Sequence, residues 1–197
     1  MTGTAARMQR EPKRSSDEQL VAQCLEGNEE AWSALIDKYK NLIYSIPVKM
    51  GMYQDAADIF QAVCLELLKE LPNLREPRAL PKWVMQTCYH KCLRHKKTSE
   101  RQVQFGEEEG ENQIAADDGS AMPEEMLAQL EREQLLRNAL AESPPRCAQM
   151  IRMLFFEIPP RPYQDIAKQL GLASGSIGFT RGRCLNRLKK YLEKMGF

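Results

Sequence analysis

The sequence is short of the residues that enzyme active sites and membrane spans need. Its 197 residues include only two histidines, and they contain no glycine-rich phosphate-binding loop and no Ser/His/Asp arrangement. No apolar run approaches the length that crosses a bilayer, and the first residues do not resemble a signal peptide. We therefore expect a protein that is not an enzyme, does not insert into a membrane and uses no metal or cofactor.

Residues that favour β-sheets are also scarce. Aromatic residues make up only 7% of the chain, and β-branched residues are sparse. Ala, Leu, Glu, Gln, Lys and Arg, all of which favour helices, dominate instead. The sequence therefore predicts an all-α fold, with length enough for one domain or two small ones.

The formal net charge is only +1, but the charge is unevenly distributed. Residues 75–97 and the chain from Arg161 onward are strongly basic, whereas residues 107–118 are acidic. Two basic regions separated by an acidic one suggest that one protein makes two contacts with nucleic acid.

The six cysteines fall mostly on the apolar faces of predicted helices, where cysteine behaves as a small hydrophobic residue. Because the sequence shows no secretory signal, we expect free thiols in a reducing cytoplasm. The residues concerned are Cys24, Cys64, Cys88, Cys92, Cys147 and Cys184.

Four residues of types that bind metals lie close together in the sequence: Cys88, His90, Cys92 and His95. Their spacing invites a zinc assignment, but on a helix His90 falls on a different face from the other three. Buried thiols beside a surface histidine are the favoured interpretation. Zinc binding and redox sensing by Cys88 and Cys92 stay open as alternatives.

Helical periodicity divides the chain into two halves of about four helices each. The first half is expected at residues 16–98, after a disordered tail at 1–15. Residues 99–123 are rich in Glu, Asp, Gly and Gln, and we expect a flexible acidic linker there. The second half would occupy residues 124–197.

The most informative stretch is YQDIAKQLGLASGSIGFTRGRCLNRLKKYL, from Tyr163 to Leu192. Its spacing predicts a helix-turn-helix in which Ala167 allows close approach, Gly171 takes the turn and Ile177 packs the second helix into the first. Ser174 is expected to be the N-cap of the second helix. A capped basic helix can enter the major groove and neutralise phosphates, and the alternative is a helical hairpin with a solvated basic face.

Two further segments complete a recognisable order: DAADIFQAVCLELLKEL at 55–71 and PKWVMQTCYHKCLRHKK at 81–97. Together with the segment from Ser143 to Leu188, they resemble the bacterial RNA polymerase sigma factors of the sigma-70 family, specifically the small extracytoplasmic-function (ECF) group. The resemblance implies sigma domain 2 at 16–98 and sigma domain 4 at 124–197. It further implies a cytoplasmic protein that binds core RNA polymerase and directs promoter-specific transcription initiation.

The resemblance also assigns sites. It implies contacts with the clamp and flap regions of the core polymerase, with promoter DNA, and with an anti-sigma factor as a candidate partner. The core-polymerase contacts would come from Asp55, Asp58 and Gln61. The minus-10 DNA contacts would come from Arg75, Arg78, Lys82, Gln86, His90 and Lys91. The minus-35 DNA contacts would come from Ser174, Ser176, Thr180, Arg181, Arg183 and Arg187.

The chain departs from the family pattern at four positions, one of which is Arg94, where the helix that engages the minus-10 element usually has an acid. Tyr89 and His90 stand where the helix that engages the minus-10 element usually has Arg and Asn, and Gly178 stands where the recognition helix often has a polar or basic residue. With Gly175 and Gly182, Gly178 weakens that helix by about 1 kcal/mol per interior glycine. The alternative function is a two-domain helix-turn-helix DNA-binding regulator that acts without polymerase and has no need of the helix at 55–71.

Overall fold

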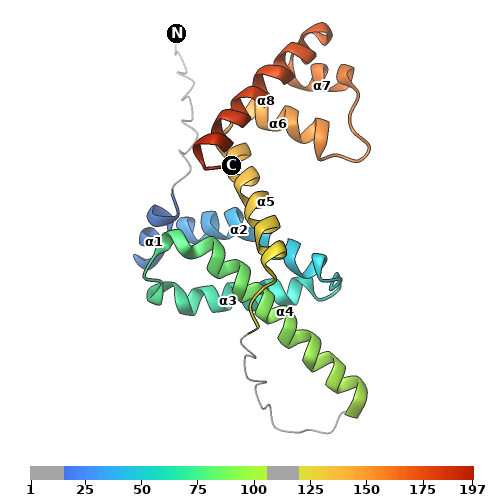
Figure 1. Ribbon diagram of the computed structural model, residues 1–197. Coiled ribbons are helices and arrows are strands. Elements are labelled where there is room, and N and C mark those ends of the chain that lie inside the picture. The colour runs from blue at the N-terminus through green and yellow to red at the C-terminus, as the bar shows by residue number, and fades with distance from the viewer. Residues whose placement is uncertain (1–15, 106–119) are drawn as a thin grey trace, which may run out of the picture. The chain divides into compact units, whose positions relative to one another are not determined.

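The computed structural model describes residues 16–105 and 120–197 (Figure 1). Over these residues the chain is helical and contains no strand, so the all-α prediction is confirmed. None of the helices in this part of the chain has both the length and the apolar character needed to cross a lipid bilayer. The predicted disordered tail at 1–15 and the middle of the predicted linker lie outside the described residues.

The chain divides into two compact helical units. Unit 1 extends to Pro123, and unit 2 is Glu124–Phe197. Unit 1 contains α1 (Asp17–Leu25), α2 (Glu29–Lys49), α3 (Ala56–Glu70) and α4 (Leu80–Phe105), with short 3₁₀ turns at Leu71–Asn73 and Pro77–Ala79 between α3 and α4. Unit 2 contains α5 (Glu124–Glu142), α6 (Pro145–Phe155), α7 (Tyr163–Leu170) and α8 (Ile177–Lys194), with a 3₁₀ turn at Ser174–Ser176 before α8.

The first helix starts where its capping residues predict. The Ser16 hydroxyl accepts a hydrogen bond from the Gln19 backbone N–H, and the Gln19 side chain accepts one from the Ser16 backbone N–H. This capping box satisfies two backbone donors that have no partner inside the helix. Asp17 and Glu18 in the first turn add negative charge at the positive end of the helix dipole.

The core of unit 1 forms around α2, which packs against α1, α3 and α4. Apolar side chains recur along α2 at helical spacing and are withdrawn from solvent because three neighbouring helices cover them. The largest fully buried side chains of this unit are Leu35, Tyr39, Leu42, Ile43, Ile46, Ile59, Leu67, Leu71, Leu80 and Met85.

The fourth helix is longer than the sequence predicts. We expected it to end near Lys97 and the linker to begin at residue 99, but α4 continues to Phe105. The residues from Thr98 to Phe105 include neither proline nor glycine, and Glu100, Arg101 and Gln102 favour helices, so nothing stops the helix before Gly106.

Unit 2 is held together by two apolar clusters that meet along α6. One joins α6 to α7 and the start of α8 and consists of Met150, Met153, Ile166, Ala167, Leu170 and Ile177. The other joins α5, α6 and α8 and consists of Ala139, Leu140, Ile151, Cys184 and Leu188.

The sequence pattern misplaces one aromatic residue of α6. We expected Phe155 to face inward, but 57% of its surface is exposed, whereas Met153 is buried. Because α6 contributes to two clusters, it is buried on both sides, and Met153 lies on the side that contacts α7. A single-stripe pattern does not describe a helix covered on two sides.

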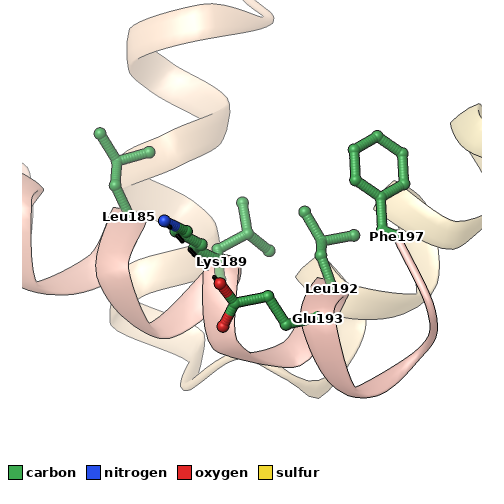
Figure 2. Close-up of a pocket in the computed structure, with 6 residues that line it drawn as sticks. Leu185, Lys189, Leu192, Glu193 and Phe197 are labelled. Carbon is green, nitrogen blue, oxygen red and sulfur yellow. Dashed lines mark ion pairs between the residues drawn. The ribbon is translucent and has the colours of Figure 1, made fainter.

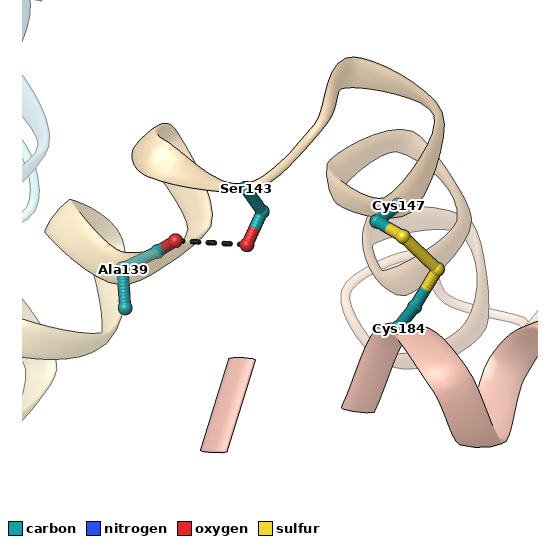
Figure 3. The surroundings of a disulfide bond; sticks show 4 residues. All are labelled: Ala139, Ser143, Cys147 and Cys184. Atoms are coloured by element: carbon teal, nitrogen blue, oxygen red, sulfur yellow. Dashed lines mark hydrogen bonds between the residues drawn. A yellow bond between two sulfur atoms is a disulfide. The ribbon is translucent and has the colours of Figure 1, made fainter. Parts of the chain in front are cut away.

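A disulfide bond between Cys147 and Cys184 connects α6 to α8 (Figure 3). This bond contradicts the expectation that all six cysteines are free thiols, whereas Cys24, Cys64, Cys88 and Cys92 are free. The two Cα atoms lie 5.3 Å apart, a separation that disulfides commonly have. The pairing could not be read from the sequence because the two cysteines are 37 positions apart and meet only when α6 packs on α8.

We predict that reduction of Cys147–Cys184 lowers the free energy of unfolding of unit 2 by about 2–4 kcal/mol, because the bond restricts the unfolded chain. Chemical denaturation of the full-length protein with and without a reductant measures the difference. The double variant Cys147→Ala/Cys184→Ala is the control and should not respond to the reductant. Equal stability of the wild-type protein in both conditions would show that the bond contributes nothing.

Candidate nucleic-acid interface

The turn between α7 and α8 has the geometry that its sequence predicts. Gly171 ends α7 in the left-handed conformation, with φ of 62°, which glycine adopts without strain. The Leu172 N–H donates to the Ala167 carbonyl at 2.8 Å and closes the turn. Ala167 and Ile177 are both buried in the same cluster, so the roles expected for Ala167, Gly171 and Ile177 are confirmed.

The start of α8 differs from the prediction. Ser174 is not its N-cap, because Ser174–Ser176 form a 3₁₀ turn and α8 begins only at Ile177. Ser176 directly precedes the helix, but its hydroxyl donates to the Ala173 carbonyl at 2.7 Å rather than accepting from the helix. The extra 3₁₀ turn therefore leaves the first turn of α8 without a side-chain cap.

Four of the predicted minus-35 contacts lie on one stripe, which begins at Ser176 just before α8 and continues along the helix. Ser176, Thr180, Arg183 and Arg187 follow the i, i+4, i+7, i+11 spacing that brings residues to a common face of a helix. Arg183 and Arg187 are exposed, and Ser176 and Thr180 are half-buried. This stripe places two guanidinium groups beside two hydroxyl groups on one side of the helix.

Arg181 does not belong to that stripe. Its Nη1 donates to the Tyr163 hydroxyl at 2.6 Å, so the side chain is directed toward α7. Tyr163 itself is exposed rather than buried in the apolar stripe of α7 that the sequence predicts. Arg181 and Tyr163 thus form a polar link between the two helices at the edge of the turn.

The side of α8 opposite its buried residues begins with Phe179, in the first turn of the helix. Phe179, Arg183, Asn186 and Lys190 are all exposed and share one face by helical spacing, and we call them the outer face of α8. The sequence reasoning missed Phe179 and Asn186. The same spacing, counted away from the buried positions Ile177, Cys184 and Leu188, would have identified them.

Three glycines at or near the outer face are not required by packing. A Cβ atom added at Gly175, Gly178 or Gly182 would meet no other atom within 4 Å. None of the three has a positive φ. Gly178 and Gly182, which lie within α8, therefore cost helix stability without relieving any contact inside the protein.

We predict that Gly178→Ala and Gly182→Ala each stabilise unit 2 by about 0.5–1 kcal/mol, because alanine loses less backbone entropy in a helix. Chemical denaturation of the full-length protein measures this. Gly171→Ala is the matched control and should destabilise the protein, because Gly171 has a positive φ. Destabilisation by the first two substitutions would contradict their open surroundings.

The predicted minus-10 residues of unit 1 fall into two groups. Lys82, Gln86 and His90 recur every four residues and share one face of α4, and Arg75 is exposed in the loop that precedes it. His90 Nε2 lies 3.2 Å from the Ser120 carbonyl oxygen. Lys82, Gln86 and His90 therefore present polar and basic side chains together on one face of α4.

Arg78 and Lys91 are engaged in ion pairs. Arg78 donates to Glu18 of α1, and its guanidinium holds the pKa of that carboxyl below its usual value. Lys91 donates to Glu66 of α3 at 2.8 Å, and this hydrogen bond lowers the pKa of Glu66. Lys91 therefore links α4 to α3 on a different side of α4 from Lys82 and Gln86.

The predicted polymerase-binding residues lie on α3 beside exposed leucines. Asp58 and Gln61 share a face with Leu65 and Leu68, which are 60% and 55% exposed, and we call these four residues the outer face of α3. The opposite stripe, Ile59, Val63 and Leu67, is buried as predicted. Asp55 lies apart from this face, at the start of the helix. Its Oδ1 atom is 3.9 Å from Nε2 of His95 in α4.

An apolar groove of about 370 Å³ follows the end of α8 (Figure 2). The groove depends on the helix terminus, where Gly196 has a φ of 86° and the Phe197 N–H donates to the Leu192 carbonyl at 3.1 Å. This pattern is a Schellman motif, which turns the chain back against the helix. The groove is lined by Leu185, Leu188, Lys189, Leu192, Glu193 and Phe197.

The candidate zinc residues do not converge. Within residues 16–105 and 120–197, no group of three or more His, Cys, Asp or Glu side chains has an arrangement that could hold a metal ion. Cys88 and Cys92 are buried, and the Cys88 thiol donates to the Ile43 carbonyl at 3.4 Å. A hydrogen bond with Cys92 and burial both raise the pKa of Cys88 well above the usual value, so its thiol stays protonated.

We predict that iodoacetamide modifies the half-buried Cys64 before it modifies Cys88 or Cys92. Alkylation requires a thiolate and access, and Cys88 has neither. Mass spectrometry of peptides from the native full-length protein, sampled over time, measures the order. Unfolded protein is the control, in which the three thiols should react at similar rates. Rapid native labelling of Cys88 would favour the redox-sensor alternative.

Comparison with known proteins identifies no family. Neither the models of protein families nor the curated proteins include a match to this chain. Among solved structures, the chain is similar to CnrH in its complex with the cytosolic domain of CnrY, with 17% identity and a TM-score of 0.35. That alignment covers 91% of this chain and 99% of the other.

Proposed function

We propose that this protein is an RNA polymerase sigma factor of the ECF group, which binds core polymerase and directs it to specific promoters. Unit 1 would bind the polymerase and the minus-10 element, and unit 2 would bind the minus-35 element. Both tasks would be carried out in the cytoplasm, and an anti-sigma factor would be a further partner.

The outer face of α3 is the main observation in support of this proposal. Leu65 and Leu68 are largely exposed and lie opposite the side of α3 that packs into the core of unit 1. Burying a leucine side chain contributes about 1.5–3 kcal/mol, so two leucines beside Asp58 and Gln61 offer a protein partner both apolar area and polar contacts. A DNA-binding regulator that acts alone has no use for such a face.

Two other surfaces suit DNA. The stripe Ser176, Thr180, Arg183 and Arg187 combines groups that hydrogen-bond base edges with groups that neutralise phosphates, as a helix in the major groove requires. Arg75, Lys82, Gln86 and His90 would hold the melted strand, which needs phosphate contacts and polar partners for unstacked bases. Arg78 would join them by exchanging Glu18 for a phosphate, because an exposed ion pair contributes little stability.

Reconstitution of the full-length protein with sigma-free core polymerase tests the proposal. The complex is presented with a library of genomic promoter fragments, and run-off transcripts are sequenced. Transcripts that start at fragments sharing two spaced elements support the sigma-factor function. Specific DNA binding that core polymerase does not alter would instead favour the two-domain regulator.

We predict that Asp58→Arg combined with Leu65→Ala weakens binding to core polymerase at least tenfold, because the pair removes an apolar contact and reverses a charge. Titration of labelled protein with core polymerase measures the affinity. The matched control is Asp37→Arg combined with Leu25→Ala, which changes an exposed acid and an exposed leucine elsewhere on unit 1. If both double variants bound core polymerase equally well, the outer face of α3 would not be the interface.

A further inference from the structure

Phe179 is the one large apolar side chain on the outer face of α8. It is 71% exposed and belongs to neither apolar cluster of unit 2. The folded unit therefore gains little from its ring. A large aromatic side chain in solvent at the start of a basic helix face is better explained by contact with a ligand than by stability.

Arg183 is positioned by that ring. The guanidinium carbon of Arg183 lies 5.7 Å from the centroid of the Phe179 ring, within the range of a cation–π interaction. One turn of α8 separates the two residues, so the guanidinium and the ring are presented together. The space beside them is open, because Gly178 and Gly182 carry no side chain.

The chemistry of this pair fits a particular feature of DNA. In the major groove, the only apolar group that a base pair displays is the C5-methyl of thymine, and phenylalanine is one of the side chains that contact it. A guanidinium beside the ring reaches guanine O6 and N7 or a phosphate. A wholly polar helix face would recognise hydrogen-bonding groups but would gain nothing from a methyl group.

We propose that Phe179 is a specificity-determining residue that contacts a thymine methyl group in the major groove, with Arg183 binding DNA next to it. This inference rests on the proposed function, in which α8 enters the major groove. It adds to that function a base preference and a residue that the resemblance to sigma factors did not assign.

Replacement of thymine by deoxyuridine removes only the methyl group and therefore tests the contact. The full-length protein, alone and with core polymerase, first selects duplexes from a synthetic library with a randomised centre. Each thymine of the selected sequence is then replaced singly by deoxyuridine, and affinities are measured at one fixed salt concentration. We expect one position at which the replacement weakens binding about fourfold, the factor for losing one buried methyl group.

Phe179→Ala should remove that sensitivity, so that the variant binds thymine and deoxyuridine duplexes equally. Because the Phe179 ring is exposed, the melting temperature of the Phe179→Ala variant should equal that of the wild-type protein. Phe156→Ala is the matched control, since Phe156 is also an exposed aromatic of unit 2 but lies outside α8, and this variant should keep the fourfold effect.

The outcomes separate the two proposals. If the protein selects no duplex in either arm, DNA reading by unit 2 fails and the role of Phe179 fails with it. If it selects a duplex but no deoxyuridine weakens binding, or the effect persists in Phe179→Ala, only the role of Phe179 is overturned. In that case the Phe179 ring contacts a protein partner or no partner at all.

Discussion

The packing of Ile177 against Ala167 is the interaction on which unit 2 depends for its candidate DNA surface. Both residues are buried in one cluster with Met150 and Met153 of α6, so the first turn of α8 is fixed to α6 and α7 together. A helix has one rotational setting once a side chain in its first turn is buried. Ile177 therefore decides that Phe179 and Arg183 point outward, and loss of its packing would turn these residues away from any ligand.

This anchoring matters more in α8 than in an ordinary helix. Gly178 and Gly182 lower its intrinsic stability, and its first turn has no side-chain cap. The stability of α8 must then come from tertiary contacts, which it makes through Ile177 at one end and through Cys184 and Leu188 further along. The bond from Cys184 to Cys147 reinforces the second of these contacts covalently, so the helix is held at two separate places on one side.

Local features of the sequence predict local structure here, and the failures involve partners distant in the chain. The spacing of Ala167, Gly171 and Ile177 encodes a turn that depends only on neighbouring residues, and the prediction is confirmed. The Cys147–Cys184 bond and the pairing of Lys91 with Glu66 arise where separate helices meet, which no local pattern records. Phe179 was overlooked for another reason: only polar and basic side chains of the second helix were considered as DNA contacts, although helical spacing from Ile177, Cys184 and Leu188 places the Phe179 ring on the exposed side.

The outer faces of α3 and α8 differ in a way that physical chemistry can interpret. On α3, Leu65 and Leu68 extend an apolar strip beside one acid and one amide, and a negatively charged nucleic acid gains nothing from such a strip. On α8, the corresponding strip is basic and polar except for Phe179, which matches a phosphate backbone with base edges between. A chain that served a single class of partner would have no reason to keep both faces exposed. The apolar-acidic face in one unit and the basic face in the other are therefore the two observations that favour the proposed recruitment of a protein machine to DNA over a function with one class of partner.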